Sequence, residues 1–293
     1  SRGLGDVYKR QFLLGGGPVE MIFAFIAAGV GNLIRMKLIK HHYTLFLNIA
    51  VSISAACLTY AVCLHMAELL LHVSAVHEAG YICSMLFIIP GFPFITSGID
   101  LAKLDLRSGL ERLTYSIIIV LGATVFAWIM ALLLNLQPQD FVALHLGSMM
   151  HLVLRLIASF CGVFGFSIMF NSSVYIAATA ACIGAVANTL RLELVDYTGM
   201  PSAAAAFIGA LTAGLLASII KRNHGYPRIS LTVPSIVIMV PGLYLYRAIY
   251  NFGIMSLTEA VLWLAAAIMI IVSLPLGLIF ARILTDRTFR HCS

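Results

Sequence analysis

Nine long apolar stretches constrain the fold of this chain more than any other feature of its sequence. A helix needs roughly 20 apolar residues to cross the hydrocarbon core of a bilayer. The stretches cover residues 19–38, 44–71, 80–99, 114–136, 152–170, 174–193, 202–220, 232–250 and 259–283. Because the apolar residues form continuous runs and do not alternate with polar ones, a transmembrane β-barrel is disfavoured. The pattern predicts an all-α integral membrane protein, a polytopic helix bundle.

The composition excludes several classes of soluble protein. Of 293 residues, 61% are hydrophobic and only 10% are charged, whereas about 25% are charged in an average soluble domain. A cytosolic enzyme, a secreted disulfide scaffold and a nucleic-acid-binding domain are therefore excluded. Five of the six cysteines lie inside apolar stretches and none forms a Cys-x-x-Cys pair, so they indicate small core residues, with neither a disulfide framework nor a metal site.

The positive charges of the loops predict the orientation in the membrane. Successive loops alternate between two sides, and eleven Lys and Arg residues fall on one side. These are Lys37, Lys40, Lys103, Arg107, Arg112, Lys221, Arg222, Arg228, Arg282, Arg287 and Arg290. The loops of the other side, at 72–78, 137–140, 195–201 and 251–258, contain no Lys or Arg. Cytoplasmic loops carry the excess of basic residues, so the basic side and the C-terminus are predicted to be cytoplasmic.

Four further arginines, Arg35, Arg155, Arg191 and Arg247, lie near the ends of apolar stretches. Long basic side chains in such positions extend to the membrane interface while their apolar stems stay in the hydrocarbon. We expect this behaviour, called snorkelling, of all four. A contact of Arg35 or Arg191 with substrate is the alternative.

Two motifs occur twice in the same order. Asn-x-x-Arg begins at Asn32 and again at Asn188, 156 positions later, and Pro-Gly begins at Pro90 and again at Pro241, 151 positions later. The two copies lie on spans that run in opposite directions through the membrane. This is the pattern of the inverted-topology repeats found in many secondary transporters.

The repeat predicts a five-plus-five arrangement of helices. Residues 12–136 form the first membrane repeat, whose first helix is expected to be lost; residues 137–151 are a linker and residues 152–285 the second repeat. Residues 286–293 are expected to form a cytoplasmic tail. Residues 1–11 lack an initiator Met and a signal-peptide core, so we interpret them as a vector or sequencing flank, or as a truncation scar.

The Pro-Gly motifs predict interrupted helices. Proline removes a backbone donor and clashes with the preceding turn, and glycine adds backbone freedom. Irregular backbone at membrane depth is tolerated only where protein or a water-filled cavity covers it. We interpret Pro90-Gly91 and Pro241-Gly242 as broken helices that line a transport site; a packing kink is the alternative.

The polar residues within the apolar stretches supply the candidate substrate site. The amides of Asn32 and Asn188 need a partner, either a neighbouring helix or a polar substrate. We hypothesise a site between the two Pro-Gly helices, lined by the asparagines and by backbone groups freed at the breaks. Its candidate residues are Asn32, Pro90, Gly91, Thr96, Asn188, Pro241, Gly242 and Tyr246.

The candidates for proton coupling are Asp100, Glu68 and His65. His65, Glu68 and His72 share one face of a helix by their spacing and could relay protons, although an interfacial position at the outer end of a long span is the alternative. Asp100 lies near the cytoplasmic end of its span, where an exposed helix-end acid is the alternative. No tight cluster of metal ligands is present, and neither a catalytic residue nor a cofactor is expected.

The segments around the Pro-Gly motifs resemble the bacterial threonine/serine exporter family. Residues 86–95, followed by Asp100, resemble the first membrane half of that family, and residues 233–242, followed by Tyr246, resemble its second half. The resemblance extends over roughly residues 16–285. It implies ten membrane helices, a cytoplasmic N-terminal domain and a place in the bacterial inner membrane. It further implies export of small hydroxy amino acids driven by the proton motive force, and a two-component branch of the family resembles succinate exporters.

We therefore predict a secondary transporter that exports threonine or serine in exchange for protons, with a dicarboxylate such as succinate as the alternative substrate. The sequence contains no Gly-x-x-x-x-Gly-Lys-Ser/Thr loop, which argues against an ATP-driven pump. A passive channel and an intramembrane enzyme remain alternatives of another class, although no catalytic constellation supports the enzyme. The expected partners are the small-molecule substrate and the bilayer; a homo-oligomer is left open, and nucleic acid is excluded.

Overall fold

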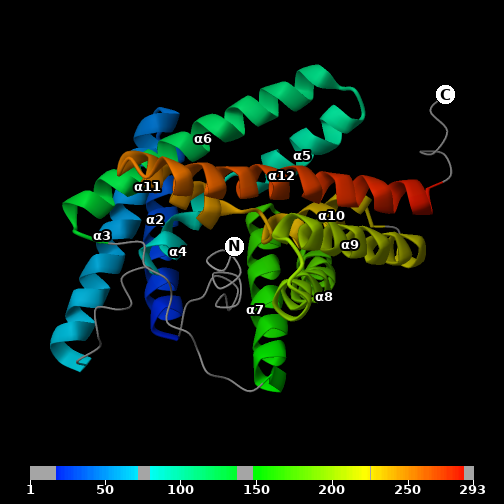
Figure 1. Ribbon diagram of the computed structural model, residues 1–293, viewed down its shortest axis with the longest axis horizontal. Helices are drawn as coiled ribbons and strands as arrows, with labels where there is room; N and C mark the ends of the chain where they lie inside the picture. Colours follow the sequence, from blue (N-terminus) through cyan, green and yellow to red (C-terminus); the bar gives the residue numbers. More distant parts are fainter. Residues whose placement is uncertain (1–17, 72–79, 137–147, 225, 287–293) are drawn as a thin grey trace. The chain divides into compact units, whose positions relative to one another are not determined.

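A computed structural model describes residues 18–71, 80–136, 148–224 and 226–286 of the chain (Figure 1). Over these ranges the regular structure is helical. Seven helices are long and apolar enough to cross a membrane. They are α2 (Pro18–Lys40), α3 (Leu45–Leu71), α6 (Leu106–Leu133), α7 (Ser148–Met169), α8 (Val174–Thr198), α9 (Ser202–His224) and α12 (Leu257–Thr285).

Two further spans consist of two helical pieces each. The first runs from α4 (Tyr81–Met85) through the 3-10 turn η2 (Leu86–Ile88) to α5 (Gly91–Ala102), and the second from α10 (Arg228–Val237) to α11 (Gly242–Gly253). With each interrupted pair counted as one span, the described part of the chain holds up to nine. Each of the nine predicted stretches coincides with one of these spans. The prediction of an all-α polytopic membrane protein is confirmed.

Both interruptions occur at the Pro-Gly motifs and have the same backbone cause. Because Pro90 has no N–H, the carbonyl of Leu86 loses its usual donor four residues ahead and accepts a hydrogen bond of 3.1 Å from the N–H of Ile89. In the second copy the carbonyl of Val237 accepts from the N–H of Val240 at 3.0 Å, since Pro241 offers no donor. Each helix thus tightens into a final short turn and stops before its proline.

The chain divides into two compact units, and each interruption lies at a boundary between them. The first unit comprises the described residues within 1–90, 115–145 and 242–267, and the second comprises those within 91–114, 146–241 and 268–293. The chain changes unit at the Pro90–Gly91 bond and again at the Pro241–Gly242 bond. Each predicted repeat, 12–136 and 152–285, therefore contributes residues to both units.

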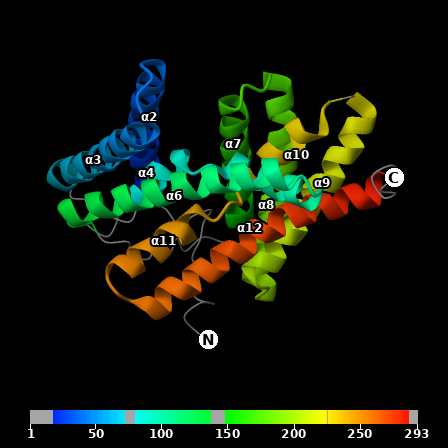
Figure 2. The same ribbon diagram turned by 90° about the horizontal axis from the view of Figure 1, so that it is seen from above.

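In the first unit, α2 packs against α3 and against α4 (Figure 2). The contacts depend on small and aromatic side chains: Ala27, Ala56 and Tyr60 are fully buried. Gly80 leaves room for the buried Tyr60, because a Cβ at this position would clash with the tyrosine hydroxyl.

In the second unit, α8 packs against α7, α9 and α10. Nine alanines of α8 and α9 are fully buried: Ala177, Ala180, Ala181, Ala187, Ala205, Ala206, Ala210, Ala213 and Ala217. Small side chains let helix backbones approach closely, and in a bilayer this close packing stabilises helix association in place of the hydrophobic effect.

Candidate functional site

At each interrupted helix, an arginine side chain donates a hydrogen bond to a backbone carbonyl just before the proline. In the first unit, Nη1 of Arg35 on α2 donates to the carbonyl oxygen of Phe87 at 3.1 Å. In the second, Nη1 of Arg191 on α8 donates to the carbonyl oxygen of Met239 at 3.2 Å. Both carbonyls lie two or three residues before a proline, where the broken helix leaves acceptors without a helical donor. The arginine of each Asn-x-x-Arg motif therefore satisfies backbone exposed by the Pro-Gly motif of the same repeat.

The expectation of snorkelling is therefore wrong for these arginines, and it is also wrong for Arg155 and Arg247. The side chain of Arg155 is buried and forms ion pairs with Glu193 and Asp196. Arg247 is 6% exposed, and its guanidinium carbon lies 4.9 Å from the centre of the Trp263 ring. Carbonyls, carboxylates and an aromatic face inside the protein offer these cations partners that the sequence alone does not reveal.

The glycine of each Pro-Gly motif packs against the end of the other interrupted helix. In the first unit, a Cβ on Gly242 would lie 2.6 Å from Cδ1 of Ile89 and 3.0 Å from Cδ2 of Leu86. In the second unit, a Cβ on Gly91 would lie 3.1 Å from Cγ1 of Val237 and 3.3 Å from Cγ2 of Val240. In both units the glycine meets the residues one and four positions before a proline, so the two units contain the same local contact.

Glycines also surround the second break. A Cβ on Gly184 of α8 would lie 2.6 Å from Cγ2 of Val163 and 2.8 Å from the carbonyl oxygen of Ser235. A Cβ on Gly209 of α9 would lie 3.3 Å from Cε of Met239. The hydroxyl of Ser235 donates across to the carbonyl of Ala180 on α8 at 2.9 Å. The broken helix α10 thus packs directly against the backbone of α8.

Asn188 lies on α8, in the second unit, and its amide is only partly satisfied. Its Nδ2 donates to Oγ of Ser159 on α7 at 2.9 Å, and the residue is 1% exposed. Its Oδ1 and the neighbouring Oγ1 of Thr189 are buried without a hydrogen-bond partner among the described residues. A buried amide oxygen without a donor is costly, so it indicates a place for a water molecule or a donating ligand.

The other predicted substrate residues have different surroundings. Asn32, in the first unit, is half-buried, and no side-chain hydrogen bond to its amide occurs in the described structure. Thr96 is buried in α5, and its hydroxyl lies 3.1 Å from the carbonyl of Phe92 in the same helix. Tyr246 is fully buried in the first unit, where its hydroxyl lies 2.5 Å from that of Tyr81.

The second unit also contains a partly buried ion cluster that was not predicted from the sequence. Arg155 of α7 is 1% exposed at its side chain; its Nη1 lies 2.7 Å from Oε1 of Glu193, and its Nη2 pairs with Asp196. Glu193 and Asp196 share one face of α8 through their i, i+3 spacing. His151, one turn before Arg155, interacts electrostatically with all three. Consecutive antiparallel helices bring the start of one next to the end of the other. An arginine early in α7 and two acids late in α8 could therefore have indicated this cluster from the sequence.

Of the three predicted proton-coupling residues, Asp100 lies in the same unit as the ion cluster and has a different ion-pair partner. Asp100 pairs with Arg112, Oδ2 to Nη1 at 2.8 Å, next to the loop that joins α5 and α6. His65 is exposed on α3. The side chain of Glu68 and the whole of His72 lie outside the described residues.

Comparison with known families agrees with this membrane architecture. Residues 11–135 match the model of ThrE, a threonine/serine exporter family, and residues 155–284 match a second model described as Threonine/Serine exporter, ThrE. No curated protein and no solved structure gives a significant match. The two family matches cover both halves of the chain and include both interrupted spans. The chain therefore belongs to the threonine/serine exporter family of membrane transporters.

Proposed function

We propose that this protein exports threonine and serine across the bacterial inner membrane, with protons moving in the opposite direction. The match of both halves to threonine/serine exporter models is the observation that carries the choice of substrate. The interrupted spans support a carrier, since many secondary transporters bind their substrates where helices are discontinuous. Dicarboxylate export has no comparable observation in its favour.

We propose that the unsatisfied amide oxygen of Asn188 accepts a hydrogen bond from the ammonium or hydroxyl group of the substrate. Both groups are donors, and threonine and serine carry both. The amide stands on α8, whose Gly184 packs against the carbonyl of Ser235 on the broken helix α10. Donors for the substrate carboxylate are available at the start of α5, where Gly91 and Phe92 carry the first N–H groups of a helix.

The substrate assignment is tested with purified protein in liposomes preloaded with unlabelled solute. Counterflow of labelled threonine should be stimulated by internal threonine or serine and should saturate with concentration. Counterflow of labelled succinate, with none of labelled threonine, would instead assign dicarboxylate transport. A flux that neither saturates nor responds to internal solute would indicate a channel, because only a carrier exchanges substrate across one reorienting site.

We propose that the Arg155–Glu193–Asp196 cluster carries the coupling proton. Ionisable groups inside membrane proteins are costly, and in transporters they commonly mark proton pathways. The cluster has one arginine and two carboxylates, so at least one carboxylate charge remains after the arginine is neutralised. Protonation of Glu193 or Asp196 would weaken an ion pair that joins α7 to α8, and α8 carries Asn188.

The coupling proposal is tested with Glu193→Gln and Asp196→Asn. Both variants keep the shape of the side chain and remove its charge, so at least one should retain threonine counterflow while losing transport driven by an imposed pH gradient. Glu111→Gln is the matched control, since it neutralises an exposed acid that pairs with Arg107 outside the cluster. Undiminished pH-driven transport in both cluster variants would overturn the assignment of the proton to this cluster.

A further inference from the structure

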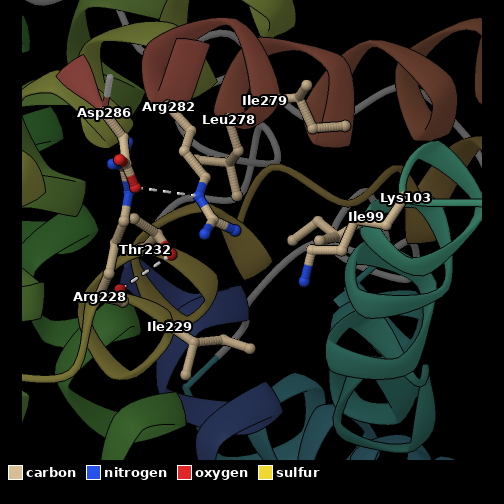
Figure 3. A pocket seen from close by; sticks show the side chains of 9 residues that line it. All are labelled: Ile99, Lys103, Arg228, Ile229, Thr232, Leu278, Ile279, Arg282 and Asp286. Carbon is tan, nitrogen blue, oxygen red and sulfur yellow. Dashed lines mark hydrogen bonds and ion pairs between the residues drawn. The ribbon is translucent and has the colours of Figure 1, made fainter. Parts of the chain in front are cut away.

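A pocket of about 200 Å³ in the second unit combines a positive charge with apolar walls (Figure 3). It lies among the end of α5, the start of α10 and the end of α12. Its lining contains the cations Lys103, Arg228 and Arg282 and one acid, Asp286. The apolar part of the lining consists of Ile99, Ile229, Leu278 and Ile279.

The cations of the pocket are only partly neutralised. Nε of Arg282 lies 3.6 Å from Oδ2 of Asp286. The same carboxylate also attracts Arg228, whose guanidinium donates to Oγ1 of Thr285 at 3.1 Å, so two arginines share one acid. The ammonium of Lys103 has neither an ion pair nor a hydrogen bond with any residue the structure describes. Figure 3 shows the side chains of Lys103 and Arg282 reaching into the space from different walls. With three cations and one carboxylate, the lining has an excess of two positive charges.

We infer that this pocket binds the phosphate group of an anionic phospholipid. A phosphate oxyanion satisfies several cations at once, and the isoleucines beside it offer an apolar surface to the acyl chains. Ile229 is 51% exposed, as expected of a side chain at a lipid-facing wall. A zwitterionic amino acid fits poorly, since its ammonium would meet Lys103 and the arginines. The three cations belong to loops or span ends of the predicted cytoplasmic side, where positively charged pockets between helices bind anionic headgroups.

The test measures the thermal unfolding of the detergent-purified full chain with added lipids. Phosphatidylglycerol should raise the midpoint of unfolding, and phosphatidylcholine, which has the same phosphate but no net charge, should not. Inorganic phosphate at millimolar concentration separates the two sources of the anion. A rise with phosphate equal to that with phosphatidylglycerol would overturn the lipid assignment in favour of a free anion.

The variants Lys103→Gln and Lys103→Gln/Arg282→Gln test whether phosphatidylglycerol binds in this pocket, which both residues line. Each removed charge should weaken phosphatidylglycerol binding by about fivefold, the usual contribution of one basic residue near an anionic membrane surface. The ammonium of Lys103 bonds to no residue in the described ranges, so the single variant should fold as the parent does. Arg107→Gln is the matched control: it removes one charge from the same predicted side, but the Arg107 side chain is 90% exposed and pairs with Glu111 outside the pocket.

Two results would contradict the inference. One is an unchanged affinity for phosphatidylglycerol in the double variant. The other is an equal loss in Arg107→Gln, which would indicate a diffuse charge effect of the whole membrane surface.

Discussion

Nη1 of Arg191 donates a hydrogen bond of 3.2 Å to the carbonyl oxygen of Met239, two residues before the proline that interrupts the second broken span. In the other unit Arg35 makes the equivalent bond, 3.1 Å long, to the carbonyl of Phe87. A proline in a helix leaves carbonyls without donors, and in a membrane no bulk water is available to satisfy them. The two arginines therefore explain how irregular backbone persists at both Pro-Gly motifs.

Replacement of Arg191 by methionine should destabilise the second unit. A hydrogen bond from a charged donor is worth about 1.5–3 kcal/mol, and its loss leaves the Met239 carbonyl without that donor. The midpoint of thermal unfolding in detergent should fall for Arg191→Met and also for Arg35→Met. Arg107→Met, at an exposed side chain, should leave it unchanged. Equal midpoints in all three variants would show that the breaks need no arginine.

Asn188 and Ser159 distinguish substrate binding from helix packing. If the free Oδ1 of Asn188 binds substrate, Asn188→Ala should weaken threonine affinity by about 5- to 150-fold, equivalent to 1–3 kcal/mol. Ser159→Ala removes only the hydroxyl that accepts from Nδ2, so it should leave the affinity unchanged. Titration calorimetry and thermal unfolding of both proteins measure the two effects separately. A lower stability with normal affinity in Asn188→Ala would assign the residue to packing.

Gly184→Ala should destabilise the contact between α8 and the broken helix. The added Cβ would lie 2.8 Å from the carbonyl oxygen of Ser235, which cannot rotate away as a side chain does. Overpacking of this kind costs about 1–3 kcal/mol. Gly165→Ala is the matched control on α7, because a Cβ there meets no atom within 4 Å. Its stability should be unchanged or higher by up to about 1 kcal/mol, since alanine favours helices.

The orientation can be tested by labelling single cysteines in a cysteine-free protein. Arg107→Cys should react with a membrane-impermeant maleimide only after the membrane is opened, because the charge of the loops predicts that this residue is cytoplasmic. Met255→Cys, 81% exposed in the loop between α11 and α12, should react in intact spheroplasts. Reaction of both from outside would exclude the nine-span topology.

The spans and the interruptions could be predicted from the sequence because they depend on local properties. Continuous apolar runs fix where helices cross, and a proline has no N–H in any surroundings. The partners of polar groups could not be predicted in this way. Arg155 and Arg191 lie near span ends, as snorkelling arginines do. Only the packing of α7, α8 and α10 reveals that Arg155 pairs with two acids and that Arg191 donates to a backbone carbonyl.

The same limit applies to the candidate site. Asn188 was identified because an amide inside an apolar stretch needs a partner, but the pairing with Ser159 depends on the packing of α7 against α8. The division into two units could not be predicted from the sequence either, because it depends on contacts between residues that are far apart in the chain. Gly91 and Gly242 belong to different units from the prolines that precede them, and no local pattern indicates that the chain changes unit at these bonds.

Proton-coupled export of threonine is tested most directly by following protons and threonine in the same vesicles. Purified protein is reconstituted with a pH-sensitive dye inside, and a threonine gradient is imposed across the membrane. We expect a proton flux opposite to the threonine flux, present with threonine or serine and absent with succinate. The proton flux should be lost in at least one of Glu193→Gln and Asp196→Asn but not in Glu111→Gln. Threonine flux without any movement of protons would contradict proton-coupled export.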